Sequence, residues 1–203
     1  MIWRMTEAGS ERAADRLVCG SILIVASAAL YWLLFMAVHE LGHAIGAWCS
    51  GGKVVGMVLS PLAISRTDVS PNPHPLFVVW CGPLIGVALP ALCATVAYYT
   101  QLPLTRWLRA FTGFCLIANG LYLASGVIRP AGDTQDMVWL GTPEWLFGAV
   151  GVAMTLAGFL VWHAMGSVWG LRMSAAAQLR RWACASVIAT AVVAAAMLAA
   201  QAI

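Results

Sequence analysis

The sequence predicts an all-α polytopic membrane protein with about five transmembrane helices and a small β-hairpin or sheet between the first two. Hydrophobic residues make up 62% of the 203 residues, and charged residues only 9%. A soluble domain is nearer half apolar and a quarter charged, because a solvated surface needs charge. A membrane-spanning helix takes roughly 20 apolar residues. The chain therefore has room for about five or six spans, and we expect a single membrane-embedded domain over residues 1–203.

Long apolar segments predict the transmembrane helices. The first is about 30 residues long, which exceeds the bilayer thickness, so it must tilt or end inside protein. The serine and glycines at residues 50–52 predict where it ends. Tryptophans near the segment ends are typical of anchors at the membrane interface. The segments cover residues 17–47, 76–99, 107–128, 145–169 and 182–203.

The stretch between the first two segments has a different pattern. Short β-like runs at residues 53–55, 57–59 and 63–65 are separated by Gly56 and Pro61 and followed by a proline-rich exit. An open sheet edge cannot face lipid. We therefore expect this hairpin to pack on protein or to lie at the membrane interface.

Basic residues predict the orientation, because cytoplasmic loops of membrane proteins carry an excess of lysine and arginine. Of the 11 basic residues, most precede the first segment or lie in the second and fourth connections. This predicts a cytoplasmic N-terminus and an outward C-terminus in a bacterial-type cell membrane. No basic patch indicates nucleic-acid binding. The cytoplasmic set is Arg4, Arg12, Arg16, Arg106, Arg109, Arg172, Arg180 and Arg181, and the outward set is Lys53, Arg66 and Arg129.

The six cysteines show no CxxC spacing. Most of them lie inside apolar segments, where cysteine behaves as a small hydrophobic residue. We expect free thiols. Cys49 and Cys81 are the only two near loops, and a disulfide or metal role stays open for that pair.

The run HELGH carries His39, Glu40 and His43 near the end of the first apolar segment. Histidines four residues apart on a helix share one face and can bind one tetrahedral zinc ion. Glu40 is placed to accept a proton from the attacking water, as in metalloproteases. Ionisable residues inside a membrane usually mark function, because burying them is costly. Gly42 and Gly46 predict close helix packing around this site.

A hydrolytic zinc ion needs a third protein ligand and an open fourth position. His74 and His163 are candidates, as are the carboxylates that follow the first helix. We interpret His163 as a core or interface histidine, and His74 as a loop residue that could line an access path. Asp133 and Asp136, in RPAGDTQDM, share one face if that segment is helical. The alternative is a solvated loop with a helix N-cap.

In combination, these features resemble the site-2 protease family of intramembrane zinc metallopeptidases. HELGH lies late in a transmembrane helix, a β-rich segment follows, and then comes CGPLIGVALP at residues 81–90. A helix bearing Asn119 then leads to the turn RPAGDTQDM. The resemblance covers residues 17–140 and leaves residues 145–203 as two additional transmembrane helices. Known members place the zinc nearer the cytoplasm, whereas the charge count places this end of the first helix outside.

The resemblance implies a role for each matching residue. His39 and His43 would bind one Zn²⁺ ion, with Glu40 as the general base. Asp133 matches the third ligand best. Asp136 remains an alternative, because the family's Asp-Gly pair is replaced here by Asp133 and threonine. Asn119 matches an asparagine of the family that binds the substrate backbone.

The expected function is that of an intramembrane zinc metalloprotease. It would hydrolyse a peptide bond in or near a transmembrane segment of a membrane-protein substrate in the lipid bilayer. Residues 54–65 could pair with the extended substrate as an added strand. Replacing outward residues there would then change cleavage and leave the zinc content intact. The alternatives are a membrane metal-binding or transport protein, and an inactive relative that acts as a scaffold. The sequence indicates no oligomeric state.

Overall fold

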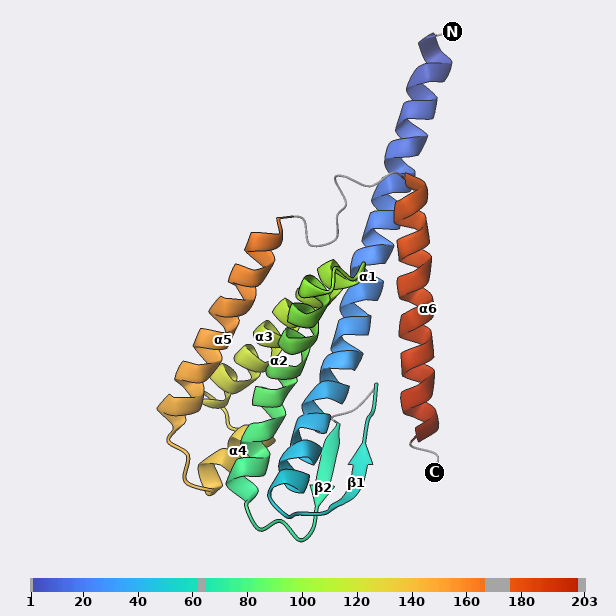
Figure 1. Ribbon diagram of the computed structural model, residues 1–203. Helices are drawn as coiled ribbons and strands as arrows, with labels where there is room; N and C mark the ends of the chain where they lie inside the picture. Colours follow the sequence, from blue (N-terminus) through green and yellow to red (C-terminus); the bar gives the residue numbers. More distant parts are fainter. Residues whose placement is uncertain (1, 62–64, 167–175, 201–203) are drawn as a thin grey trace.

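The computed structural model describes residues 2–61, 65–166 and 176–200. These residues form helices and one small antiparallel sheet (Figure 1). All the helices except α4 are long and apolar enough to cross a membrane. The predicted class, a polytopic α-helical membrane protein with a small sheet between the first two helices, is confirmed. The elements are α1 (Ile2–Cys49), β1 (Val54–Val58), β2 (Arg66–Val69), α2 (Pro75–Tyr99), α3 (Thr105–Gly126), α4 (Asp133–Trp139), α5 (Glu144–Met165) and α6 (Ala176–Ala200).

The predicted apolar segments correspond to α1, α2, α3, α5 and α6. The largest difference is at the start of α1, because the N-terminal lead-in and the first span form one continuous helix of 48 residues. At 1.5 Å per residue this helix is about 72 Å long, far more than a bilayer needs. The predicted ends of the fourth and fifth segments, Trp169 and Ile203, lie outside the described residues.

The C-terminal end of α1 lies inside the protein. Ala44 and Ala47 are fully buried there. The helix stops where predicted: Gly51 adopts a positive φ of 80°, and the amide of Gly52 donates to the carbonyl of Ala47 at 2.8 Å. The sequence predicted that this overlong segment would either tilt or end inside protein, and the structure shows its end buried in protein.

α1 runs through the middle of the helix arrangement, with α6 on one side and α2 on the other, while α5 packs on α3 (Figure 1). Among the described helices, α6 packs mainly on α1. Two polar contacts join them: the hydroxyls of Ser27 and Ser186 lie 3.2 Å apart, and Thr190 donates to the carbonyl of Ala26 at 3.0 Å. The sheet and α4 lie at the end of the molecule opposite to the N-terminus.

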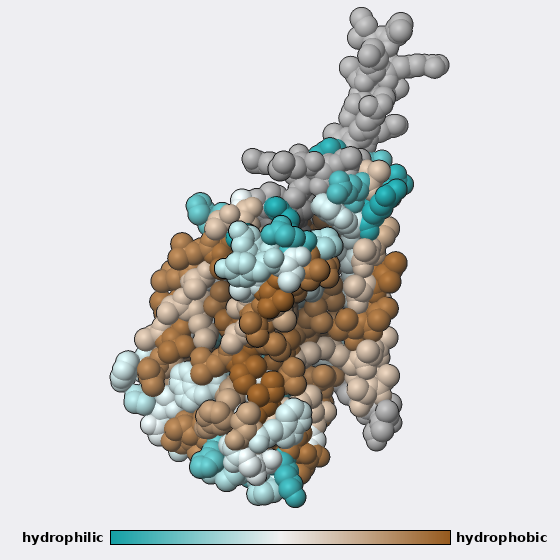
Figure 2. Space-filling model, viewed as in Figure 1, coloured by the Kyte–Doolittle hydropathy of each residue, from teal (hydrophilic) through white to brown (hydrophobic). Residues whose placement is uncertain are grey.

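Surface hydropathy agrees with a position across a membrane. Figure 2 shows hydrophobic residues over the middle of the visible face and hydrophilic residues toward its two ends. Many large apolar side chains are exposed on the outer helices, including Leu156 and Leu160 on α5 and Val192 on α6. In a water-soluble protein such a surface would be a large apolar patch, whereas here it suits contact with lipid tails.

The predicted hairpin is present, but its second strand begins later than expected. β1 pairs antiparallel with β2, and Met57 lies opposite Thr67. The described strand begins one residue after Ser65, the last residue of the β-like run at residues 63–65, and residues 63 and 64 lie outside the described residues. β2 reads RTDV and lacks an apolar alternation, because it packs a polar side chain on α1. The sheet packs on protein, as expected.

An aromatic cluster joins α1 to α3 just before the histidines. The ring of Tyr31 lies 5.6 Å from that of Phe111, and the ring of Phe35 lies 6.3 Å from that of Phe114. Aromatic pairs at such distances are stabilising beyond the area that they bury. Phe35 also lies 5.9 Å from the ring of His39. This packing positions α3 along α1 beside the HELGH residues.

Candidate metal centre

The last turns of α1 carry the two histidines and the glutamate of HELGH. All three residues are buried, with 8%, 6% and 7% of the surface of His39, Glu40 and His43 exposed. The helix places the two imidazoles one turn apart, with 3.2 Å between their Nε2 atoms. The rings therefore point to a common position.

Each imidazole is oriented by a hydrogen bond at its Nδ1 atom. Nδ1 of His43 lies 2.9 Å from the carbonyl of Val78, which can only accept, so this nitrogen carries the proton. Nδ1 of His39 lies 2.9 Å from Oδ1 of Asn119 and donates in the same way. In the neutral form of each ring, Nε2 then carries the lone pair, as metal-binding histidines require.

Asp133 completes a group of three ligand atoms. Its Oδ2 lies 2.8 Å from Nε2 of His39 and 3.3 Å from Nε2 of His43. Atoms bound tetrahedrally to one zinc ion at about 2.1 Å are spaced about 3.4 Å apart, so the triangle needs only slight expansion to hold that ion. His39, His43 and Asp133 form the only such group among the described residues. Asp136 is not part of it.

Tyr122 and Gly132 bring Asp133 to the histidines. The hydroxyl of Tyr122 accepts the amide proton of Asp133 at 2.7 Å and donates to the carbonyl of Ala131 at 3.1 Å. Gly132 precedes α4 with a φ of 56°, and a Cβ atom there would lie 2.6 Å from the same hydroxyl. A glycine is needed at this position for both reasons.

Charge at the site favours an ionised ligand. Burial raises the pKa of Asp133, but hydrogen bonds and charge interactions with the protonated forms of His39 and His43 outweigh burial and lower this pKa below its usual range. Partial burial and the charge of Asp133 raise the pKa of Asp136. The two carboxyls are therefore not equivalent, and Asp133 is held as the anion, the form that could bind a metal ion.

Glycines let α2 approach this site closely. A Cβ atom on Gly42 would lie 2.5 Å from the carbonyl of Cys81, and one on Gly46 would lie 2.7 Å from the side chain of Cys81. The predicted close packing around these two residues is confirmed. A Cβ atom on Gly82 would overlap the rings of His39 and His43. Because Gly82 has no side chain, the Nε2 atoms of both rings stay accessible to an ion.

The three ligands and Glu40 line a cavity of about 1440 Å³. Its polar part is at the metal centre, and its apolar part continues along α1 to Trp32 and along α3 to Phe114. Every residue of β2 lines the cavity, together with Ser65. Successive side chains of a strand point to opposite faces, so an unbroken run of lining residues indicates that the edge of β2 faces the cavity. No residue of β1 lines it.

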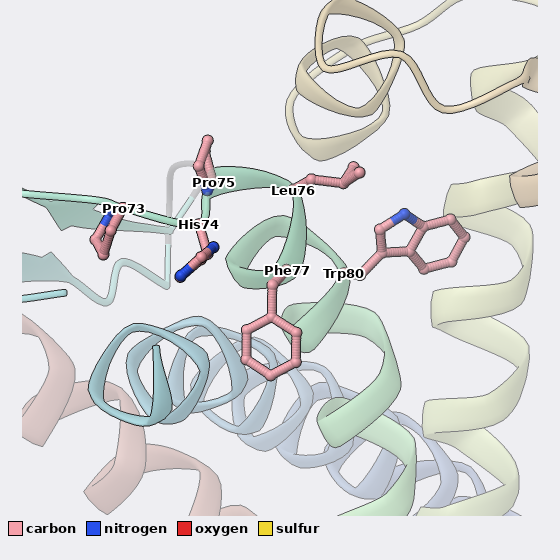
Figure 3. A pocket seen from close by; sticks show the side chains of 6 residues that line it. All are labelled: Pro73, His74, Pro75, Leu76, Phe77 and Trp80. Atoms are coloured by element: carbon pink, nitrogen blue, oxygen red, sulfur yellow. The ribbon is translucent and has the colours of Figure 1, made fainter. Parts of the chain in front are cut away.

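The other candidate ligands lie elsewhere. His74 lines a separate hollow of about 500 Å³ at the start of α2, beside Phe77 and Trp80 (Figure 3). His163 is exposed in the last turn of α5. Cys49 and Cys81 are both free thiols, as are the remaining cysteines. None of these residues belongs to the metal group.

Several residues of the site were not predicted. Tyr122 follows Asn119 by three residues on α3, so their shared helix face was a usable signal. Gly132 precedes the ligand, and glycine in a turn is a further signal. Thr67 gave no usable signal, because its strand has no apolar pattern. Its hydroxyl donates to Oε2 of Glu40 at 2.7 Å. The carbonyl of Val78 is a backbone group, which no sequence pattern reveals.

Asn119 is expected to act through His39. Asn119→Ala removes the acceptor that fixes the His39 ring, and losing such an outer partner lowers metal affinity by about 10- to 100-fold. Zinc titration of the metal-free protein measures this. Thr112→Val on the same helix, which loses only a bond to its own turn, should leave the affinity unchanged. A higher KM with unchanged zinc affinity would instead favour the substrate-binding role that the resemblance implies.

The site thus combines two oriented imidazoles, an ionised carboxylate and an adjacent glutamate in one cavity. Two nitrogen ligands and one oxygen ligand suit zinc and similar transition metals better than magnesium or calcium. Comparisons with protein-family models, with curated proteins and with solved structures found no match.

Proposed function

We propose that this protein is an intramembrane zinc metalloprotease of the site-2 protease type. It hydrolyses a peptide bond in or near a transmembrane segment of a membrane-protein substrate. One observation carries the proposal. The ligand atoms of His39, His43 and Asp133 lie within 4.8 Å of one another, and Glu40 lines the same cavity. Three protein ligands that leave a fourth position open are typical of catalytic zinc sites, whereas structural sites are closed.

The chemistry follows from the residues around the ion. A zinc ion held by His39, His43 and Asp133 would supply Lewis acidity for activating water and polarising a carbonyl. Glu40 accepts the proton of the attacking water and passes it to the leaving amine. Asn119 and the carbonyl of Val78 keep both imidazoles in the orientation that binds metal. Much of the cavity wall is apolar, and charge interactions are stronger in such surroundings than in water.

The shape of the cavity supports a substrate that comes from the membrane. Its apolar part, lined by Trp32 and Phe35 on α1 and by Phe114 on α3, suits the side chains of a transmembrane segment. A peptide bond within a helix is protected, so the substrate must become extended near the ion. The strand expected to pair with it at residues 54–65 is replaced in this proposal by β2, whose edge faces the cavity.

The proposal places the metal centre near the outer surface of the membrane. α1 begins at the end that the charge count assigns to the cytoplasm, and HELGH lies at the other end of this helix, beside the sheet (Figure 1). A reagent that modifies cysteine and does not cross membranes tests this orientation. Exposed Cys49, the last residue of α1, should react from outside in intact cells.

Metal removal tests the proposed function. Purified protein in detergent should cleave dye-labelled casein, an unfolded polypeptide that needs no local unwinding. A zinc chelator should abolish this cleavage, and about one equivalent of zinc should restore it, because one ion serves the site. Magnesium should not restore it, since imidazole ligands disfavour that ion. Cleavage that persists in protein shown by elemental analysis to be metal-free would contradict the proposal.

A further inference from the structure

Thr67 is the only described residue that hydrogen-bonds to the carboxylate of Glu40. Its Oγ1 lies 2.7 Å from Oε2 of Glu40 and 3.2 Å from the backbone carbonyl of the same residue. A hydroxyl has one hydrogen to donate, and a charged acceptor at the shorter distance is the stronger one. Oε1 has no hydrogen-bond partner among the described residues, and Glu40 lines the cavity. Oε2 is thus held by Thr67, while Oε1 stays available to accept a proton.

The helix alone does not aim Glu40 at the metal position. Successive residues of a helix are about 100° apart around its axis, so Glu40 does not share the face of His39 and His43. Its side chain must bend back toward that face, and a glutamate has several rotatable bonds with which to bend elsewhere. A general base has to lie within hydrogen-bond reach of the proton that it takes. Some contact outside α1 is therefore needed to restrict the carboxylate.

We propose that Thr67 is a positioning residue that holds the Glu40 carboxylate beside the metal centre, an inference that rests on the proposed protease function. β2 fixes the hydroxyl, because Thr67 is paired with Met57 in the sheet. Thr67 also lines the cavity, together with its strand neighbours Arg66 and Asp68. The same strand therefore borders the space for substrate and orients the base, so that a substrate lying along β2 meets a carboxylate already in place.

The kinetic test compares Thr67→Val with Thr67→Ser. Valine keeps the shape of threonine and removes the hydroxyl, whereas serine keeps the donor. With dye-labelled casein as the probe, Thr67→Val should lower kcat about tenfold, part of the 10²- to 10⁴-fold that a general base contributes. KM should change less than about twofold, and the zinc content should be unchanged. Thr67→Ser should stay within about threefold of the wild type. Thr95→Val, which loses a bond only to its own helix, is the matched control.

A second measurement requires neither zinc nor cleavage. The melting temperatures of chelator-treated wild type, Thr67→Val, Glu40→Ala and the double variant form a double-mutant cycle. A real contact should make the two changes non-additive by about 3 °C, which corresponds to roughly 1 kcal/mol for a chain of this size. Additive shifts would show that the hydroxyl and the carboxylate do not interact, and would overturn the proposal whatever the protein catalyses.

The outcomes separate this inference from the proposed function. Non-additive melting, lower kcat in Thr67→Val and recovery in Thr67→Ser support it. If the wild type cleaves casein with zinc and Thr67→Val cleaves equally well, the positioning role is wrong while the protease function stands. If zinc-loaded wild type does not cleave casein at all, the protease function fails and the positioning role fails with it, even where the melting temperatures show coupling.

Discussion

Asp133→Ala is expected to remove zinc from the protein, and Asp136→Ala is expected to leave it bound. Asp133 places Oδ2 within 3.3 Å of both Nε2 atoms, whereas Asp136 is not part of the metal group. Losing only an outer partner of a ligand lowers metal affinity by about 10- to 100-fold. The loss of a ligand itself should therefore lower zinc affinity by more than about a hundredfold. Elemental analysis of the purified variants and competition with a zinc indicator measure this.

The two aspartates form a matched pair, because they lie one turn apart at the start of the same short helix. Both substitutions remove one carboxylate from the first turn of α4, so general effects on folding or helix stability should be similar. A difference in zinc content then reports the ligand. Zinc lost from Asp136→Ala and kept by Asp133→Ala would assign the third ligand to Asp136. Zinc kept by both variants would exclude the three-ligand site.

Local pattern explains which parts of the site could be predicted. His39 and His43 are four residues apart on one helix, so their mutual position follows from helix geometry alone. The close packing at Gly42 was also predictable, since small residues in a membrane helix mark contact with a neighbour. The end of α1 at Gly51 follows from the freedom of glycine to adopt a positive φ. Each of these predictions depends on a few adjacent residues.

Predictions that depend on distant parts of the chain were less complete. Asp133 lies 94 residues after His39, and sequence reasoning left it beside Asp136 as an alternative. The choice depends on the packing of α3 against α1 and on the Tyr122 hydroxyl, which no spacing in the sequence reveals. Residues 66–69 were not predicted as a strand for a related reason. Thr67 contacts Glu40 instead of an apolar core, so its strand lacks the alternation by which strands are predicted.

Asn119 was predicted to contact substrate, but in the structure it contacts His39. The resemblance implies that Asn119 binds the substrate backbone. In the structure Asn119 is fully buried, and its Oδ1 accepts from Nδ1 of His39. Its Nδ2 atom has no hydrogen-bond partner among the residues that the structure describes. An unpaired buried donor is costly, so Nδ2 remains the atom through which a substrate contact would have to occur.

Glu40→Gln is expected to abolish proteolysis while the protein keeps its zinc. Glutamine has the size of glutamate and its amide oxygen can still accept from Thr67, but it cannot take a proton from water. General-base catalysis contributes about 10²- to 10⁴-fold, so casein cleavage should fall at least a hundredfold. Zinc content should stay at the wild-type level, because Glu40 is not among the three ligands. Glu144→Gln at the start of α5, outside the cavity lining, is the matched control and should cleave normally.

The same variant separates the protease from both alternatives. A metal transporter uses His39 and His43 as ligands and has no need of a base, so zinc uptake by cells or vesicles should persist in Glu40→Gln. A scaffold holds its partners through surfaces far from the carboxylate, so their binding should persist as well. Loss of zinc together with loss of cleavage would mean that Glu40 supports the metal and not the proton transfer. Cleavage at the wild-type rate would exclude Glu40 as the base. Loss of cleavage with zinc retained is the single result that only a hydrolytic role predicts, because only hydrolysis requires a group that accepts a proton beside the ion.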